Sequence, residues 1–129
     1  MTEHNLLMDS SAWIEYFNGT KPGQKVKELI ENEKYLVLNP NIVAAEVTSK
    51  IARFGGNVEK AITAIKTLSI PVREDQELFF EAGKQHFHLK KKFKNISLAD
   101  SIIKTIAEKN NAVIVTKDRH LNGKKTILI

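Results

Sequence analysis

The stretch "LLMDSSAW", residues 6–13, runs from apolar residues directly into Asp9, and two serines follow. The stretch "AVIVTKD", residues 112–118, repeats this pattern near the other end of the chain and ends on Asp118. Short runs that are apolar throughout are typical of strands buried on both faces of a sheet. One carboxylate after such a strand could belong to a turn, but two of them indicate a functional site.

The rest of the chain alternates between short apolar runs and amphipathic segments. We predict strands over residues 5–9, 35–38, 70–73, 112–115 and 126–129. We predict helices over residues 10–17, 20–33, 39–56, 57–69, 74–93 and 97–110. This order predicts an α/β fold in which helices cover both faces of a short-stranded, mostly parallel central sheet. Ligands bind beyond the carboxyl ends of such strands, where Asp9 and Asp118 fall.

Apolar residues at helical spacing predict which helix faces are buried. In the helix over 39–56 the predicted buried positions are Val43, Val47, Ile51 and Phe54. In the helix over 74–93 they are Leu78, Phe79, Ala82, His86, Phe87, Leu89 and Phe93. Trp13 and Phe17 fit one face of the first helix, which favours packing in the core or a dimer over base stacking. His86 and His88 are expected to be structural or surface groups.

Length and composition limit the class of protein. A chain of 129 residues predicts a single domain over residues 1–129. The absence of cysteine excludes disulfides and thiolate metal sites, and it is compatible with reduced cytosol. The N-terminus lacks the features of a signal peptide, and no apolar run approaches the roughly 20 residues of a membrane span. We therefore expect a cytoplasmic protein with no membrane partner.

The net charge of +5 weakly favours a polyanionic partner. Much of the excess lies in "KKKFK", residues 90–94. Lysines at the end of a helix are favoured by the negative pole of its dipole, so a solvated helix end explains them. Contact with nucleic acid is an equally good explanation, and the two are compatible.

Two acidic residues at strand ends have ordinary structural explanations as well as functional ones. Asp9 precedes a predicted helix, and aspartate is a favoured N-cap residue. Asp118 lies in "TKDRH", where aspartate is common in turns.

Two acidic residues on helices are also ambiguous. Asp100 lies three residues after Ser97, in a variant of the capping box, yet it also lies beside the apolar stripe of its helix. Glu46 lies at the edge of the buried face of its helix. Lys50 follows four residues later, in the order that favours a surface ion pair.

Taken together, the four acids indicate a metal site. Carboxylates gathered in one place repel one another, and a divalent cation relieves this repulsion. Oxygen ligands without cysteine favour Mg²⁺ or Mn²⁺ over zinc. Such ions, held by few carboxylates and several waters, suit phosphoryl chemistry.

The four acids and their surroundings resemble the acidic blocks of PIN-domain ribonucleases. The blocks are "LLMDSSAWIEYF" with Asp9, "NPNIVAAEV" with Glu46, "ISLADSIIKTIA" with Asp100 and "AVIVTKDRHL" with Asp118. Their order and spacing, and the length of the chain, are most similar to the VapC-type toxins of type II toxin–antitoxin systems. The resemblance spans essentially the whole chain.

This resemblance implies a three-layer α/β/α sandwich and a metal-dependent endoribonuclease that cleaves RNA phosphodiester bonds. It implies that Asp9, Asp100 and Asp118 hold Mg²⁺ or Mn²⁺, and that Glu46 completes the site or orients the attacking water. The expected products carry a 5′-phosphate and a 3′-hydroxyl. The expected partners are an RNA substrate, a second copy in a homodimer, and a cognate antitoxin that represses transcription and covers the acidic groove.

Residues near the four acids are secondary candidates. Ser11 and Thr116, each two residues from an acid, are expected to hydrogen-bond to the site. Four basic residues are candidates for contact with RNA phosphates, although ordinary surface charge explains each of them: Lys50, Arg53, Lys117 and Arg119. Single-stranded loops are the natural target, because their bases can be splayed out and read.

Other functions fit less well. Haloacid-dehalogenase-like enzymes need a second aspartate two residues after the first, where this chain has Ser11. Response-regulator receivers need a phosphorylatable aspartate on a middle strand, and "YLVLN" contains none. A PIN nuclease that processes RNA outside a toxin pair is an alternative. An inactive module that binds RNA or protein is another, but the intact set of four acids argues against it.

Overall fold

A five-stranded parallel sheet forms the centre of the structure, a computed structural model that describes residues 4–121 and 125–129. Its strands are β1 (Asn5–Met8), β2 (Leu36–Asn39), β3 (Ile70–Pro71), β4 (Ala112–Thr116) and β5 (Thr126–Leu128). Their order across the sheet is β3-β2-β1-β4-β5, and every neighbouring pair is parallel. The predicted parallel sheet is confirmed, with β1 and β4 side by side.

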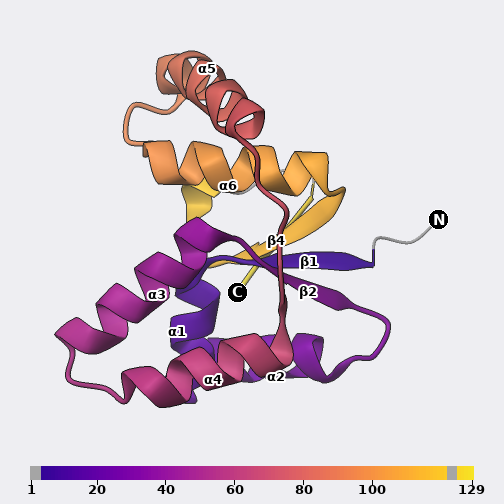
Figure 1. The fold of residues 1–129 in the computed structure, drawn as a ribbon, viewed down its shortest axis with the longest axis vertical. Coiled ribbons are helices and arrows are strands. Elements are labelled where there is room, and N and C mark those ends of the chain that lie inside the picture. Colours follow the sequence, from indigo (N-terminus) through magenta and orange to yellow (C-terminus); the bar gives the residue numbers. More distant parts are fainter. Residues whose placement is uncertain (1–3, 122–124) are drawn as a thin grey trace.

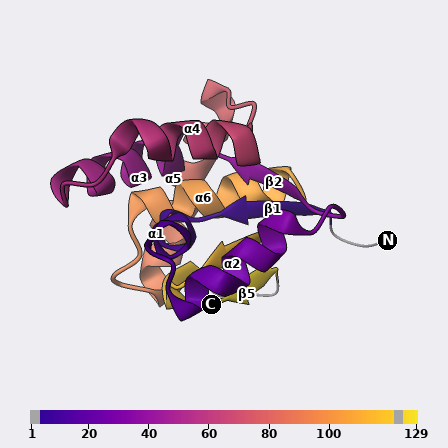
Figure 2. The same cartoon turned by 90° about the horizontal axis from the view of Figure 1, so that it is seen from below.

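Helices cover both faces of this sheet. They are α1 (Ser10–Asn18), α2 (Lys21–Glu31), α3 (Asn41–Arg53), α4 (Val58–Leu68), α5 (Gln76–Lys92) and α6 (Leu98–Lys109). A short 3-10 helix, η1 (Arg119–Leu121), was not predicted. In Figure 1 α5 and α6 lie above the sheet and α1 to α4 below it, and Figure 2 shows α1 to α4 from beneath. The three-layer α/β/α sandwich is therefore confirmed.

The core lies between the central strands and their covering helices. Leu6, Leu7 and Met8 of β1 are each 0% exposed, because helices pack against both faces of the strand. Val47 of α3 and Ile106 of α6 are equally buried. No helix within the described ranges is long and apolar enough to span a membrane.

Several phenylalanines that were predicted to be buried are exposed. Phe79 of α5 is 38% exposed, Phe87 is 63% exposed, and Phe93 just after this helix is 43% exposed. The reason is that α5 is the outermost helix and packs mainly on α6, so only a narrow stripe around Leu78 and Ala82 is covered. Phe54 is 76% exposed because it follows the last turn of α3.

Candidate active site

The Asp9 carboxylate is buried at the carboxyl end of β1. Its side chain makes no N-cap hydrogen bond to the first turn of α1, so the capping explanation is wrong for this residue. Instead its Oδ2 accepts a hydrogen bond of 2.9 Å from Ser11 Oγ and one of 2.8 Å from Thr116 Oγ1. Its backbone N–H donates to the Val115 carbonyl at 3.0 Å. These contacts fix the carboxylate between α1 and β4.

The same two hydroxyls organise the segment that follows β4. Ser11 Oγ accepts a 3.0 Å hydrogen bond from the backbone N–H of Lys117. Thr116 Oγ1 accepts one of 2.8 Å from the backbone N–H of Asp118. The segment that carries Asp118 is therefore held directly beside the Asp9 network.

Three of the four acids influence one another electrostatically. Burial is the main cause of the raised pKa of Asp9, hydrogen bonds from Thr116 and Ser11 oppose it, and the charge of Asp100 adds to it. Burial also raises the pKa of Glu46, and the charges of Asp9 and Asp100 raise it further. The structure therefore brings Asp9, Glu46 and Asp100 from three separate elements into one electrostatic cluster.

Glu46 shows an unsatisfied polar atom in this cluster. Its Oε1 is buried and has no hydrogen-bond partner among the described residues. The Ser10 hydroxyl and the more distant Lys50 charge lower its pKa, but they do not outweigh burial and the neighbouring acids. Glu46 and Lys50, both in the described ranges, do not form an ion pair within 4 Å, so the predicted surface pair is absent.

Asp100 has the structural role that its sequence context suggested. Its Oδ2 accepts from the backbone N–H of Ser97 at 3.2 Å, and its own backbone N–H donates to Ser97 Oγ at 3.0 Å. This reciprocal pair is a capping box at the start of α6. The capping role accounts for the position of Asp100, and it is compatible with the effect of its charge on Asp9 and Glu46.

The donor set suits a hard divalent cation. Within residues 4–121 and 125–129, no three His, Asp or Glu side chains are gathered closely enough to hold an ion by themselves. Mg²⁺ characteristically binds through one or two carboxylates and keeps several waters, so a looser arrangement is sufficient for it. The unpartnered Glu46 oxygen and the mutually repelling acids are what such a cation would satisfy.

The basic candidates, which lie near these acids in the sequence, are exposed on the surface. Lys50 and Arg53 are exposed in the last turn of α3, and Arg119 is exposed in η1. Lys117 forms a 3.2 Å ion pair with Glu15 of α1. This pairing leaves Lys117 partly engaged within the protein.

Sequence reasoning missed two residues at this site. Ser10 lowers the pKa of Glu46, although "DSS" was visible as a polar pair after Asp9. The pKa of Glu15 is lowered mainly by a hydrogen bond from Thr20 Oγ1, at 2.6 Å, and also by Lys117. Glu15 gave no local signal because Lys117 is 102 residues away in the sequence.

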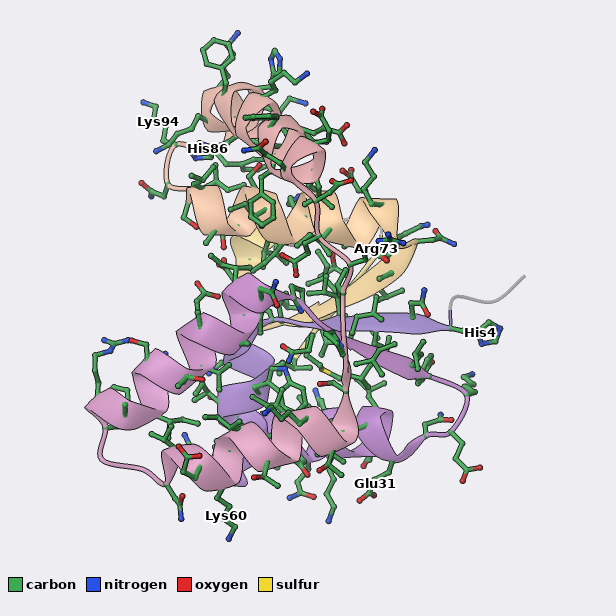
Figure 3. All side chains as sticks on the ribbon, viewed as in Figure 1. His4, Glu31, Lys60, Arg73, His86 and Lys94 are labelled. Carbon is green, nitrogen blue, oxygen red and sulfur yellow. The ribbon has the colours of Figure 1, made fainter. Side chains whose placement is uncertain are left out.

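Two other features lie apart from the acids. His86 Nε2 lies 3.1 Å from the Ile96 carbonyl oxygen, so His86 connects α5 to the loop before α6. Figure 3 labels His86 on α5. A groove of about 710 Å³ lies between α1, α2, α3 and α4, and it is lined by Phe17, Ile51 and Phe54 among others. None of the four acids lines this groove.

The sequence profile of the PIN domain matches residues 6–125 of the chain. The chain belongs to the PIN domain family. The match includes all four acidic blocks, and it agrees with the sheet and helix arrangement described above. No curated protein sequence matches the chain significantly.

Solved structures share this PIN fold. VapBC2 from Rickettsia felis, bound to a promoter DNA fragment, aligns with a TM-score of 0.68 and 16% identity over 88% of each chain. VapC20 from Mycobacterium tuberculosis, described as a Sarcin-Ricin loop cleaving toxin, aligns with a TM-score of 0.66 and 17% identity. The alignment covers 83% of this chain and 84% of that one. VapBC-1 from nontypeable Haemophilus influenzae aligns with a TM-score of 0.63 and 24% identity. The alignment covers 91% of this chain and 89% of that one. At these identities the likeness establishes a shared fold.

Proposed function

We propose that this PIN-domain protein is a divalent-metal-dependent endoribonuclease and the VapC-type toxin of a toxin–antitoxin pair. The observation that carries the proposal is the electrostatic cluster of Asp9, Glu46 and Asp100, with the buried, unpartnered Oε1 of Glu46 within it. Membership of the PIN family supports nuclease chemistry. The fold shared with VapC toxins supports the toxin role.

The acids would hold Mg²⁺ or Mn²⁺ through Asp9, Asp100 and Asp118, with Glu46 completing the site. Bound there, the cation would supply Lewis-acid stabilisation of the phosphate and a more acidic water. Asp118 is the member whose part depends most on the resemblance. Its backbone N–H donates to Thr116 Oγ1 at 2.8 Å, and this hydrogen bond holds the Asp118 backbone beside the Asp9 network.

The chain's own groups would position these acids and the substrate. Ser11 and Thr116 donate to the same Asp9 oxygen, and this fixes the carboxylate's orientation. Glu46, whose buried Oε1 has no hydrogen-bond partner among the described residues, would complete the site or orient the attacking water. The exposed basic residues Lys50, Arg53, Lys117 and Arg119 would contact RNA phosphates.

A toxin needs an inhibitor, and the proposed partner is a cognate antitoxin that covers the acidic site. Solved structures with this fold include complexes described as VapBC and as a toxin–antitoxin complex from Klebsiella pneumoniae. A homodimer is proposed from the resemblance of the chain to VapC-type toxins.

The test is RNA cleavage by the purified chain with Mg²⁺, with Mn²⁺ and with EDTA. Asp100→Asn removes the charge but keeps an oxygen that can accept from the Ser97 N–H, so the helix cap survives. Ser97→Ala is the matched control, because it weakens the cap and leaves the carboxylate in place. The proposal expects cleavage at discrete sites by wild type and by Ser97→Ala, and none by Asp100→Asn or in EDTA. Equal cleavage by all three proteins would show that the activity lies elsewhere.

A further inference from the structure

The outer face of α5 presents aromatic and basic side chains in alternation. Phe80, Lys84, Phe87 and Lys91 follow one another at intervals of four, three and four residues, so they share one helical face. This face, here called the α5 strip, points away from the buried Leu78 and Ala82. Phe80 is 55% exposed and Phe87 is 63% exposed, and both lysines are exposed.

The surroundings of the C-terminal part of the α5 strip are strongly basic, whereas Glu77 and Glu81 lie on the same surface as Phe80 and Lys84. Residues 82–99 contain no acidic residue and five lysines: Lys84, Lys90, Lys91, Lys92 and Lys94. The charge of this segment is therefore +5, which equals the net charge of the whole chain. None of these lysines forms an ion pair with a carboxylate in the part of the chain that the structure describes.

Aromatic residues are concentrated in the same place. The segment over 79–93 holds four of the chain's six phenylalanines: Phe79, Phe80, Phe87 and Phe93. All four are at least 38% exposed. Lys91 Nζ lies 4.6 Å from the centre of the Phe87 ring, so a cation and an aromatic face are already paired on the strip.

The helix dipole explains part of this composition but not all of it. Lys90, Lys91 and Lys92 lie in the last turn of α5, where positive charge is favoured, and Lys90 Nζ donates to the Lys94 carbonyl at 2.8 Å. A dipole does not account for the exposed phenylalanines, because burying these side chains would lower the free energy of the folded state. It also does not account for Lys84, two turns before the end of the helix.

We propose that the α5 strip binds a single-stranded stretch of the RNA substrate, with bases stacked on Phe80 and Phe87 and phosphates contacted by Lys84 and Lys91. Alternating aromatic and basic side chains suit single strands, because every base offers a face for stacking and every nucleotide carries a charge. The inference rests on the proposed function for the identity of the ligand.

The position of the strip fits a route to the acids. The loop that follows α5 leads into α6, whose first turn carries Asp100. Figure 1 shows this loop on the same side of the molecule as the end of β1, and Figure 3 places Lys94 at that turn. An RNA strand lying along the strip would therefore be directed toward the candidate active site.

A second copy of the chain is a less suitable occupant. Pairing two strips would bring ten lysines of residues 82–99 near one interface, and like charges there repel. Glu77 and Glu81 lie in the first turns of α5, and Glu81 is engaged with Lys109 at 3.4 Å. The charge distribution therefore favours a polyanion over self-association.

Fluorescence anisotropy of a labelled oligouridine, with the full chain in EDTA, tests the proposal in the absence of metal. Phe80→Ala and Phe87→Ala should each weaken binding by about fivefold or more. Lys84→Gln with Lys91→Gln should lower the slope of log affinity against log salt by about 1.4. Phe54→Ala, just after α3, and Lys66→Gln, on α4, change exposed residues away from the strip and should leave affinity within about twofold.

Three results would overturn the proposal. One is failure of the wild type to bind oligouridine at low salt, and another is equal binding by the strip variants and the wild type. The third is that Phe80→Ala or Phe87→Ala dissociates a dimer of the wild type, measured by sedimentation, without changing RNA affinity per protomer. Metal-dependent cleavage in any of these cases would leave the proposed function intact. Strip-dependent binding by a chain that never cleaves RNA would support the strip and refute the nuclease proposal.

Discussion

Thr116 Oγ1 at the end of β4 donates a 2.8 Å hydrogen bond to Oδ2 of Asp9 at the end of β1, across 107 residues of sequence. Both residues are buried, and the parallel pairing of β1 with β4 brings them together. The bond joins the two stretches of sequence that each end on a carboxylate. It also compensates for part of the cost of burying the Asp9 charge.

Thr116→Val should destabilise the protein by about 1–3 kcal/mol. The substitution keeps the shape of the side chain, but it leaves Asp9 without one donor and the Asp118 N–H without its acceptor. Urea unfolding measures the change in free energy. Thr67→Val is the control, because its exposed hydroxyl bonds only to a carbonyl of its own helix, and it should change stability by about 0.5 kcal/mol or less. Equal effects of the two substitutions would contradict this account of Thr116.

Without divalent metal, the protein should become less stable as the pH rises above the ordinary range of carboxylates. The pKa values of Asp9 and Glu46 are raised in the folded state, so the folded state binds more protons than the unfolded state in this window. The stabilisation is complete below their unfolded pKa values of about 4, and it is lost as the pH passes through the raised ones. Thermal unfolding in EDTA across pH 4–8 measures the trend.

Asp9→Asn should flatten this pH dependence, because the residue that replaces the acid does not ionise. Asp75→Asn is the matched control, since Asp75 is an exposed N-cap residue of α5. A wild-type protein that gains stability with rising pH over the same window would show that the acids are not held in a repulsive cluster.

Ser97→Ala should lower stability by about 1 kcal/mol, because it removes the acceptor for the Asp100 N–H at the start of α6. Asp100→Asn should lower stability by less than Ser97→Ala does, since the asparagine side-chain oxygen can still accept a hydrogen bond from the Ser97 N–H. Chemical unfolding of both variants separates the structural role of Asp100 from its proposed role in metal binding. A larger loss for Asp100→Asn would mean that the charge itself stabilises the fold.

Gly23→Ala should destabilise the protein severely. A Cβ at Gly23 would lie 2.1 Å from the Glu15 carbonyl oxygen, so α1 and α2 would have to move apart. Gly83→Ala is the matched change on the exposed side of α5, where a Cβ meets no atom within 4 Å. It should raise stability by about 0.5–1 kcal/mol, because alanine favours helix interiors. Thermal unfolding of the two variants should therefore shift in opposite directions.

The sheet and the placement of its strand-end acids followed from local sequence pattern. Residues 6–8 of β1 and 112–115 of β4 are all apolar because both faces of these strands are covered, and this property is visible in the sequence alone. Capping side chains mark two of the helix starts, because Thr20 and Asn57 accept hydrogen bonds from the backbone at the starts of α2 and α4.

The exposure of the α5 phenylalanines and the contacts between distant elements could not be predicted from the local sequence pattern. Helical spacing grouped Phe79 and Phe87 with Leu78 and Ala82, but the width of the buried stripe depends on how many elements pack on the helix. Because α5 packs mainly on α6, the stripe is narrow and the phenylalanines are exposed. Glu15 and Ser10 were missed for a related reason, since their partners come from other elements of the fold.

Calorimetric titration with Mn²⁺ tests the central claim, that four acids from separate elements serve one divalent cation. The account predicts that wild type and Asp75→Asn bind Mn²⁺ with the same affinity. It predicts that Asp9→Asn, Glu46→Gln, Asp100→Asn and Asp118→Asn each bind at least about tenfold more weakly. A wild-type protein that binds no Mn²⁺, or acid variants that bind it as tightly as wild type, would contradict the assignment of the site.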